Sequence, residues 1–274
     1  MMKKIILAIL FVSLCVSAKP VSKLTKAQEL YIAQKVSANE ILGRDEYLIH
    51  WNYGEDFASL GIGHFIWFSK GHTERFREVF PMVLKYMEDR NVSMPSWLTS
   101  KTPLPWNSKQ EMYAAKARND KQYQELFNFL QNTKDVQAGF LADRLFKALP
   151  QILDTIDDPN KAAMIEERFN KILYNRDGSL NEHGVYVLTD YVNFKGEGTL
   201  PSERYNGQGW GLLQVLEHMD PKESDRFKAF SDSAKAMLSR RIANSPKARG
   251  EERWRKGWNK RLDTYLVPKA DNAK

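Results

Sequence analysis

The 274-residue chain is 42% hydrophobic and 27% charged, with 15 Gly and 11 Pro, which fits a globular protein and excludes collagen-like or mainly disordered chains. The only stretch apolar enough to enter a membrane lies at the N-terminus, which excludes a multi-span membrane protein. The single Cys excludes a disulfide framework within one chain.

Residues 1–18 have the pattern of a secretory signal peptide. Two lysines precede an apolar run at 5–16, which is shorter than the ~20 residues that span a bilayer, and small residues lead to a cleavage site after Ala18. We therefore expect export to the periplasm or the extracellular space, with no stable membrane span after cleavage. An uncleaved anchor and a lipoprotein on Cys15 are the alternatives. Because cleavage removes Cys15, thiol catalysis and a Cys-based zinc site are excluded, and we expect no metal and no cofactor.

The first element predicted after the signal is a helix from Thr25 to Glu40. Thr25 and Gln28 have the spacing of a capping box. Ile32, Val36 and Glu40 recur at intervals of four, which predicts that Glu40 lies on an apolar face near the end of the helix.

A small antiparallel sheet is predicted over residues 47–68. Apolar and polar residues alternate from Tyr47 to Trp51, residues 52–56 have turn chemistry, and Gly61 and Gly63 mark a second tight turn before the last strand.

The rest of the chain is predicted to be almost wholly helical, with no internal repeat or interdomain linker. We therefore expect one domain over 19–274, mainly α with a small N-terminal sheet, in other words an α+β fold. The predicted helices cover residues 73–91 with a kink at Pro81, 108–118, 119–133, 135–148, 159–175, 185–194, 211–219, and 221–244 with Pro221 in the first helical position.

The basic character of the chain is concentrated in its C-terminal segment, residues 240–274. This segment holds 11 Lys or Arg and 4 Asp or Glu, a net charge of +7, whereas residues 19–239 hold 28 basic and 30 acidic residues. In an exported protein, such a segment favours anionic envelope polymers, such as peptidoglycan, teichoic acids or lipid head groups, over nucleic acid. A solvated helix face is the alternative. The oligomeric state stays open.

The absence of several catalytic motifs favours chemistry carried out by Asp and Glu side chains. The chain has no H-E-x-x-H, no P-loop and no G-x-S-x-G, so zinc-protease, phosphate-loop and serine-hydrolase chemistries are not indicated. Asp and Glu with hydroxyl, amide and aromatic helpers suit glycoside cleavage.

A family resemblance appears at Ser59-Leu-Gly-Ile-Gly-His64, which resembles the [TS]-[IL]-G-[IY]-G-H segment of phage-type lysozymes. The resemblance implies a lysozyme-like fold, with Glu40 as the catalytic Glu at a helix end and the sheet lining a cleft. It implies that Ser59 helps to hold the attacking water and that His64 lies at the substrate. The Asp expected eight residues before the first motif glycine is Tyr53 here, so we assign the second carboxylate to Glu55, with Asp56 as the alternative.

A general acid must be protonated at neutral pH, which requires a raised pKa. Burial of Glu40 against apolar neighbours and its place at a helix C-terminus both favour the uncharged carboxyl group. The sequence therefore predicts a raised pKa for Glu40.

A second constellation follows near the end of the apolar run at 185–194. Gly211-Leu-Leu-Gln214 resembles the G-L-M-Q motif of lytic transglycosylases, and Glu197 precedes it as the catalytic Glu does in that family. We expect this segment to line the same cleft. A Gly-rich turn that leads into a buried helix is the alternative. The predicted substrate-binding residues are Asn193, Glu197, Tyr205 and Gln214 through hydrogen bonds, and Trp210 by stacking on a sugar ring.

Together these patterns predict an exported peptidoglycan hydrolase that cleaves β-1,4 glycosidic bonds with Glu40 as general acid. Three alternatives remain open: a lytic transglycosylase that uses Glu197, a chitosanase-like enzyme acting on de-N-acetylated glycan, and a non-catalytic peptidoglycan-binding module.

Overall fold

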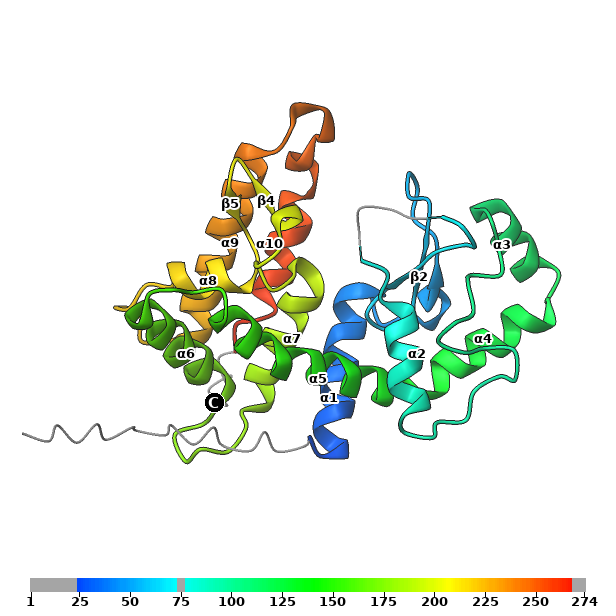
Figure 1. The fold of residues 1–274 in the computed structure, drawn as a ribbon, viewed down its shortest axis with the longest axis horizontal. Helices are drawn as coiled ribbons and strands as arrows, with labels where there is room; N and C mark the ends of the chain where they lie inside the picture. Colours follow the sequence, from blue (N-terminus) through cyan, green and yellow to red (C-terminus); the bar gives the residue numbers. More distant parts are fainter. Residues whose placement is uncertain (1–23, 73–76, 268–274) are drawn as a thin grey trace, which may run out of the picture.

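The computed structural model describes residues 24–72 and 77–267. The predicted signal peptide and the last residues of the basic segment lie outside the described residues. The fold class is confirmed: the chain is mainly helical, with a three-stranded antiparallel sheet near its N-terminus (Figure 1). No helix in the described ranges is both long and apolar enough to cross a bilayer.

The helices and strands follow one another in a simple order. They are α1 (Lys26–Glu40), β1 (Ile49–His50), β2 (Ala58–Leu60), β3 (Phe65–Trp67), α2 (Phe80–Glu88), α3 (Lys109–Ala117), α4 (Lys121–Asn132), α5 (Lys134–Leu153), α6 (Pro159–Leu173), α7 (Glu182–Lys195), β4 (Arg204–Tyr205), β5 (Gln208–Gly209), α8 (Leu212–His218), α9 (Arg226–Asn244) and α10 (Arg255–Asp263), with short 3₁₀ turns at Asp45–Tyr47, Pro201–Glu203, Lys247–Arg249 and Glu251–Trp254.

Helix α1 begins and ends as predicted. The backbone N–H of Gln28 is capped by the Thr25 hydroxyl (3.3 Å), and the Gln28 side chain accepts from the Thr25 backbone N–H (2.9 Å). Ile32 and Val36 are buried, so the apolar stripe faces the core. Glu40 ends the helix.

The sheet has the order β1-β2-β3, and its register places Ser59 opposite His50 and Ile66. The glycine turn that follows β2 is packed against α5. The backbone N–H of Ile62 donates to Oε1 of Gln137 (2.8 Å), and a Cβ on Gly61 would meet that oxygen at 2.2 Å. With φ of +69°, position 61 therefore requires glycine for both conformation and space.

The elements are arranged around three central helices (Figure 1). Helices α1, α5 and α7 pack on one another; the sheet and α2 to α4 lie on one side of them, and α6, α8, α9 and α10 lie on the other. The buried apolar side chains form one continuous cluster that runs from Trp67 in β3 through Leu145 in α5 to Phe230 in α9. Glu40, at the end of α1, therefore lies where elements of both sides meet.

Two helix starts that the sequence placed wrongly lie near prolines. Helix α2 begins at Phe80 with Pro81 in its first turn, so Pro81 starts the helix instead of kinking it. Helix α9 begins at Arg226, where the Asp225 carboxylate accepts from two backbone N–H groups, and Pro221 lies in the preceding turn. The predicted helix at 135–148 continues through Pro150 to Leu153.

Candidate functional site

Glu40 lies in a polar network at the end of α1. Nη2 of Arg261 in α10 donates to Oε1 of Glu40 (2.6 Å), and Nδ2 of Asn193 in α7 donates to the same oxygen (3.0 Å). The Glu40 side chain is 14% exposed. The prediction of apolar surroundings is therefore wrong for the Glu40 carboxylate itself, because α7 and α10 each contribute a polar side chain that hydrogen-bonds it.

Arg261 joins Glu40 to a second carboxylate, that of Asp190. Two guanidinium nitrogens of Arg261 donate to the two oxygens of Asp190, each at 2.8 Å, and the Tyr265 hydroxyl donates to Oδ2 at 2.5 Å. Asp190 is completely buried. A charge in this position requires a partner, and this requirement was the one signal in the sequence for it: a single Asp within the apolar run at 185–194.

Asn193 also connects Glu40 to the glycine turn. Its Nδ2 donates to the carbonyl oxygen of Gly63 (3.1 Å) as well as to Glu40. The next residue in the turn, His64, has φ of +47°, its Nε2 donates to the carbonyl oxygen of Tyr47 (3.3 Å), and its ring stacks on His50 with centroids 5.9 Å apart. The structure thus brings together Glu40, His64 and Asn193, three of the predicted site residues.

The electrostatics of Glu40 differ from the sequence-based expectation. Burial raises the pKa of Glu40, but the Arg261 charge and hydrogen bond, helped by His64 and Asn193, outweigh it and lower that pKa below its usual value. The expected raised pKa is therefore wrong for the free protein, in which Glu40 is a carboxylate. Burial is also the main reason why the pKa of His64 is lowered.

Glu55 lies in the hairpin turn, and its hydrogen-bond partners differ from those of Glu40. Nδ2 of Asn52 donates to its carboxylate (2.8 Å), and the Trp51 indole donates to its backbone carbonyl (2.7 Å). It lines a hollow of about 280 Å³ together with Ser69, Asn107 and other polar residues. Burial raises the pKa of Glu55, and the Asn52 hydrogen bond only partly opposes this. Of the two predicted catalytic carboxyl groups, Glu55 is thus the one whose surroundings favour the protonated form.

Ser59 is buried in β2, between the Glu55 loop and the glycine turn. It pairs with His50, whose ring stacks on His64. Ser59 is therefore connected to the His64 end of the site through its cross-strand neighbour.

The second constellation is held by contacts within the protein. Arg144 donates to both carboxylate oxygens of Glu197 (3.0 and 3.2 Å). The Gln214 amide donates to the Gly198 carbonyl oxygen and accepts from the Gly211 N–H, each at 3.0 Å. Gln214 is buried, so in this structure it fastens two glycine segments to each other instead of facing a sugar.

The aromatic residues of that constellation also have partners inside the protein. Trp210 is only 5% exposed, and its ring lies against Tyr205 (4.7 Å between centroids) and under the Arg241 guanidinium (4.3 Å). The Tyr205 hydroxyl donates to Glu251 (2.9 Å). The Trp210 ring therefore packs within the fold, and its predicted role as a sugar platform is not what this structure shows.

Some basic side chains of the C-terminal segment are buried in ion pairs with carboxylates of the same protein. Arg241 and Arg249 both donate to the buried carboxylate of Glu251, and Arg261 is 9% exposed. Burial opposes ionisation of Glu251, but these two arginines outweigh it and lower its pKa to about 2. The exposed cations of the segment include Arg253, Lys256 and Lys260, whereas Arg261 is paired with Glu40 and Asp190 inside the protein.

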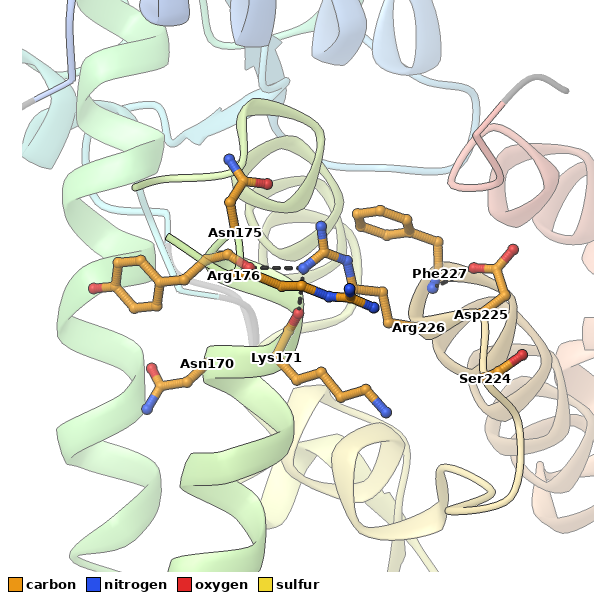
Figure 2. Close-up of a pocket in the computed structure, with 9 residues that line it drawn as sticks. Asn170, Lys171, Asn175, Arg176, Ser224, Asp225, Arg226 and Phe227 are labelled. Atoms are coloured by element: carbon orange, nitrogen blue, oxygen red, sulfur yellow. Dashed lines mark hydrogen bonds between the residues drawn. The ribbon is translucent and has the colours of Figure 1, made fainter. Parts of the chain in front are cut away.

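A larger hollow, of about 580 Å³, lies between the end of α6 and the start of α9 (Figure 2). Figure 2 shows Arg226 reaching the last turn of α6, where it donates to the carbonyl oxygens of Lys171 (2.8 Å) and Tyr174 (2.7 Å). These bonds satisfy carbonyl groups at a helix end, which is a structural role. None of the predicted site residues lines this hollow.

In the described part of the chain, no group of three or more His, Cys, Asp or Glu is placed to hold a metal ion. Comparison of the chain with protein-family models, with curated proteins and with solved structures finds no match in any of the three.

Proposed function

We propose that this protein is an exported, lysozyme-like hydrolase of peptidoglycan glycan strands, with Glu40 as its central catalytic carboxyl group. The observation that carries the proposal is the hydrogen bonding of Asn193 to both Glu40 and Gly63. It joins the helix-end Glu, the glycine turn that resembles the phage-type lysozyme segment, and the start of the second constellation in one place.

Glu40 acts in this proposal as a general acid that gains its proton when the glycan binds. A sugar over the carboxyl group removes water and so adds to the effect of burial, which opposes the lowering of the Glu40 pKa by Arg261. Arg261 keeps its two-point pair with Asp190 if its single bond to Glu40 breaks. The second carboxyl group of the proposal is Glu55, which would bind or activate water together with Ser59.

The contacts favour this reading over the alternatives. Both oxygens of Glu197 are engaged by Arg144, which argues against Glu197 as the acid of a transglycosylase. A non-catalytic module has no need of a buried carboxylate held by two separate helices.

Mass spectrometry of digested sacculi tests the proposal directly. The protein is expected to release muropeptides with reducing ends, and Glu40→Gln is expected to lower the rate by ~10²–10⁴, the usual contribution of general acid–base catalysis. Glu46→Gln, at an exposed Glu in the next turn, is the matched control and is expected to keep full activity. Anhydro-muropeptides from the wild type, or full activity in Glu40→Gln, would refute the assignment.

A further inference from the structure

Lys195, the last residue of α7, has its amine enclosed by aromatic rings. Its Nζ lies 3.7 Å from the ring centroid of Phe194 and 3.8 Å from that of Trp258. In the described ranges 24–72 and 77–267, no carboxylate lies within 4.0 Å of this nitrogen. The amine is thus held between two aromatic rings without a carboxylate partner among the described residues.

The two arginines that share these rings do have carboxylate partners. Arg261 lies over Phe194 (4.1 Å) and pairs with Asp190 and Glu40, whereas Arg241 lies over Trp258 (5.1 Å) and pairs with Glu251. Lys195 is therefore the basic group at these rings that has no carboxylate paired with it in the described residues.

This position is unfavourable for an isolated ammonium group. Burial, followed by the charges of Arg241 in α9 and Arg261 in α10, lowers the pKa of Lys195 well below its usual value, and Glu251 and Glu40 only partly oppose them. An arriving anion would reverse that imbalance, because it supplies the counter-charge that the fold leaves out.

The amine lies close enough to the proposed catalytic carboxyl group of Glu40 to interact with it electrostatically, and it lies beside partly exposed aromatic rings. Lys195 lies two residues after Asn193, which hydrogen-bonds Glu40. Trp258 is partly exposed and lies beside Trp254, also partly exposed, with ring centroids 5.6 Å apart. Aromatic rings with one polar end exposed are well suited to contact both the apolar face and the hydroxyl groups of a pyranose.

We propose that Lys195, between Phe194 and Trp258, binds a carboxylate carried by the substituents of the glycan. This inference rests on the proposed function and deepens it: the preferred substrate is a glycan strand that bears carboxylates, as peptide-substituted peptidoglycan does, in preference to a neutral N-acetylglucosamine polymer. Trp258 and Trp254 contact the sugar rings, and Lys195 selects for the charge.

Binding to two matched soluble glycans tests the selection. The probes are a peptide-bearing peptidoglycan fragment and an N-acetylglucosamine oligosaccharide with the same number of sugars, titrated into the full chain carrying Glu40→Gln to prevent cleavage. Adding Lys195→Met is expected to raise the Kd of the carboxylated probe about tenfold or more, as loss of a charge-assisted hydrogen bond does, and to leave the Kd of the neutral probe unchanged.

Two further variants separate recognition from loss of folding. Lys195→Arg keeps the charge and is expected to retain the preference for the carboxylated probe. Lys222→Met removes an exposed Lys that lies outside the basic C-terminal segment, and is expected to change neither Kd. Thermal unfolding of each variant tests whether the fold is intact.

The outcomes for the inference and for the proposed function are distinct. The inference is overturned if Lys195→Met raises the Kd of both probes equally or leaves the Kd of the carboxylated probe unchanged. It is also overturned if neither probe binds. If the wild type cleaves no sacculi but the Lys195-dependent preference is present, the hydrolase proposal fails while the anion site stands.

Discussion

Nη2 of Arg261 lies 2.6 Å from Oε1 of Glu40, although 221 residues separate them in the chain. The proposed catalytic helix end is thus completed by the C-terminal helix. The same guanidinium holds the buried Asp190 at two points, so the free protein keeps Glu40 ionised through a group that has an alternative partner.

The first prediction concerns the pH dependence of cleavage in Arg261→Lys. Arg261 lowers the pKa of Glu40, so a weaker partner should raise it. A general acid is lost as pH rises through its pKa. The high-pH limb of kcat/KM should therefore move to higher pH in the variant, as a pH–rate profile would show. A lower kcat/KM at every pH, with the high-pH limb at the same pH as in the wild type, would mean that Arg261 acts on structure alone.

The second prediction concerns stability in acid. The pKa of Glu251 is lowered to about 2, so its ion pairs with Arg241 and Arg249 are fully present above its unfolded value of 4.5 and are lost as pH falls toward 2. This shift corresponds to stability on the order of 3 kcal/mol. Chemical unfolding at several pH values should show a steeper loss below pH 4.5 for the wild type than for Glu251→Gln. Parallel curves would contradict the assignment.

The third prediction concerns attraction to the cell wall. Arg253 and Lys256 are exposed, so their charges are screened over ~8–10 Å at physiological salt. Co-sedimentation with sacculi should weaken as salt rises, and changing Arg253, Lys256 and Lys260 to Gln should remove most of that dependence. The buried Arg261 should not contribute to it. Salt-independent binding would identify the segment as a solvated helix face.

The fourth prediction concerns the second carboxyl group. Glu55→Gln is expected to reduce cleavage strongly, whereas Asp56→Asn, at the neighbouring exposed residue, should not. An inverting hydrolase needs its carboxyl groups ~6.5–9.5 Å apart and a retaining one ~5–5.5 Å. Proton NMR of the first-formed anomer distinguishes the two. Equal, full activity of both variants would leave Glu40 as the one catalytic carboxyl group of the proposal.

Local patterns in the sequence were sufficient for the fold class and for most helix boundaries. The capping box at Thr25 and Gln28 and the turn glycine at position 61 act within a few residues, so their physical consequences can be predicted from neighbours alone. Pro81 and Pro221 were placed wrongly because a proline is compatible with a first turn, a kink or a loop, and packing decides among them.

The sequence by itself identified Glu40, His64 and Asn193 as candidates, each from its own segment. Only the tertiary structure decided their electrostatics, because the pKa of Glu40 depends on Arg261 and not on the helix that carries it. The same holds for Gln214 and Trp210, whose side chains suit either a sugar or the protein interior. Charge pairing and burial are sums over neighbours from distant segments, and no local pattern encodes which of those neighbours arrive.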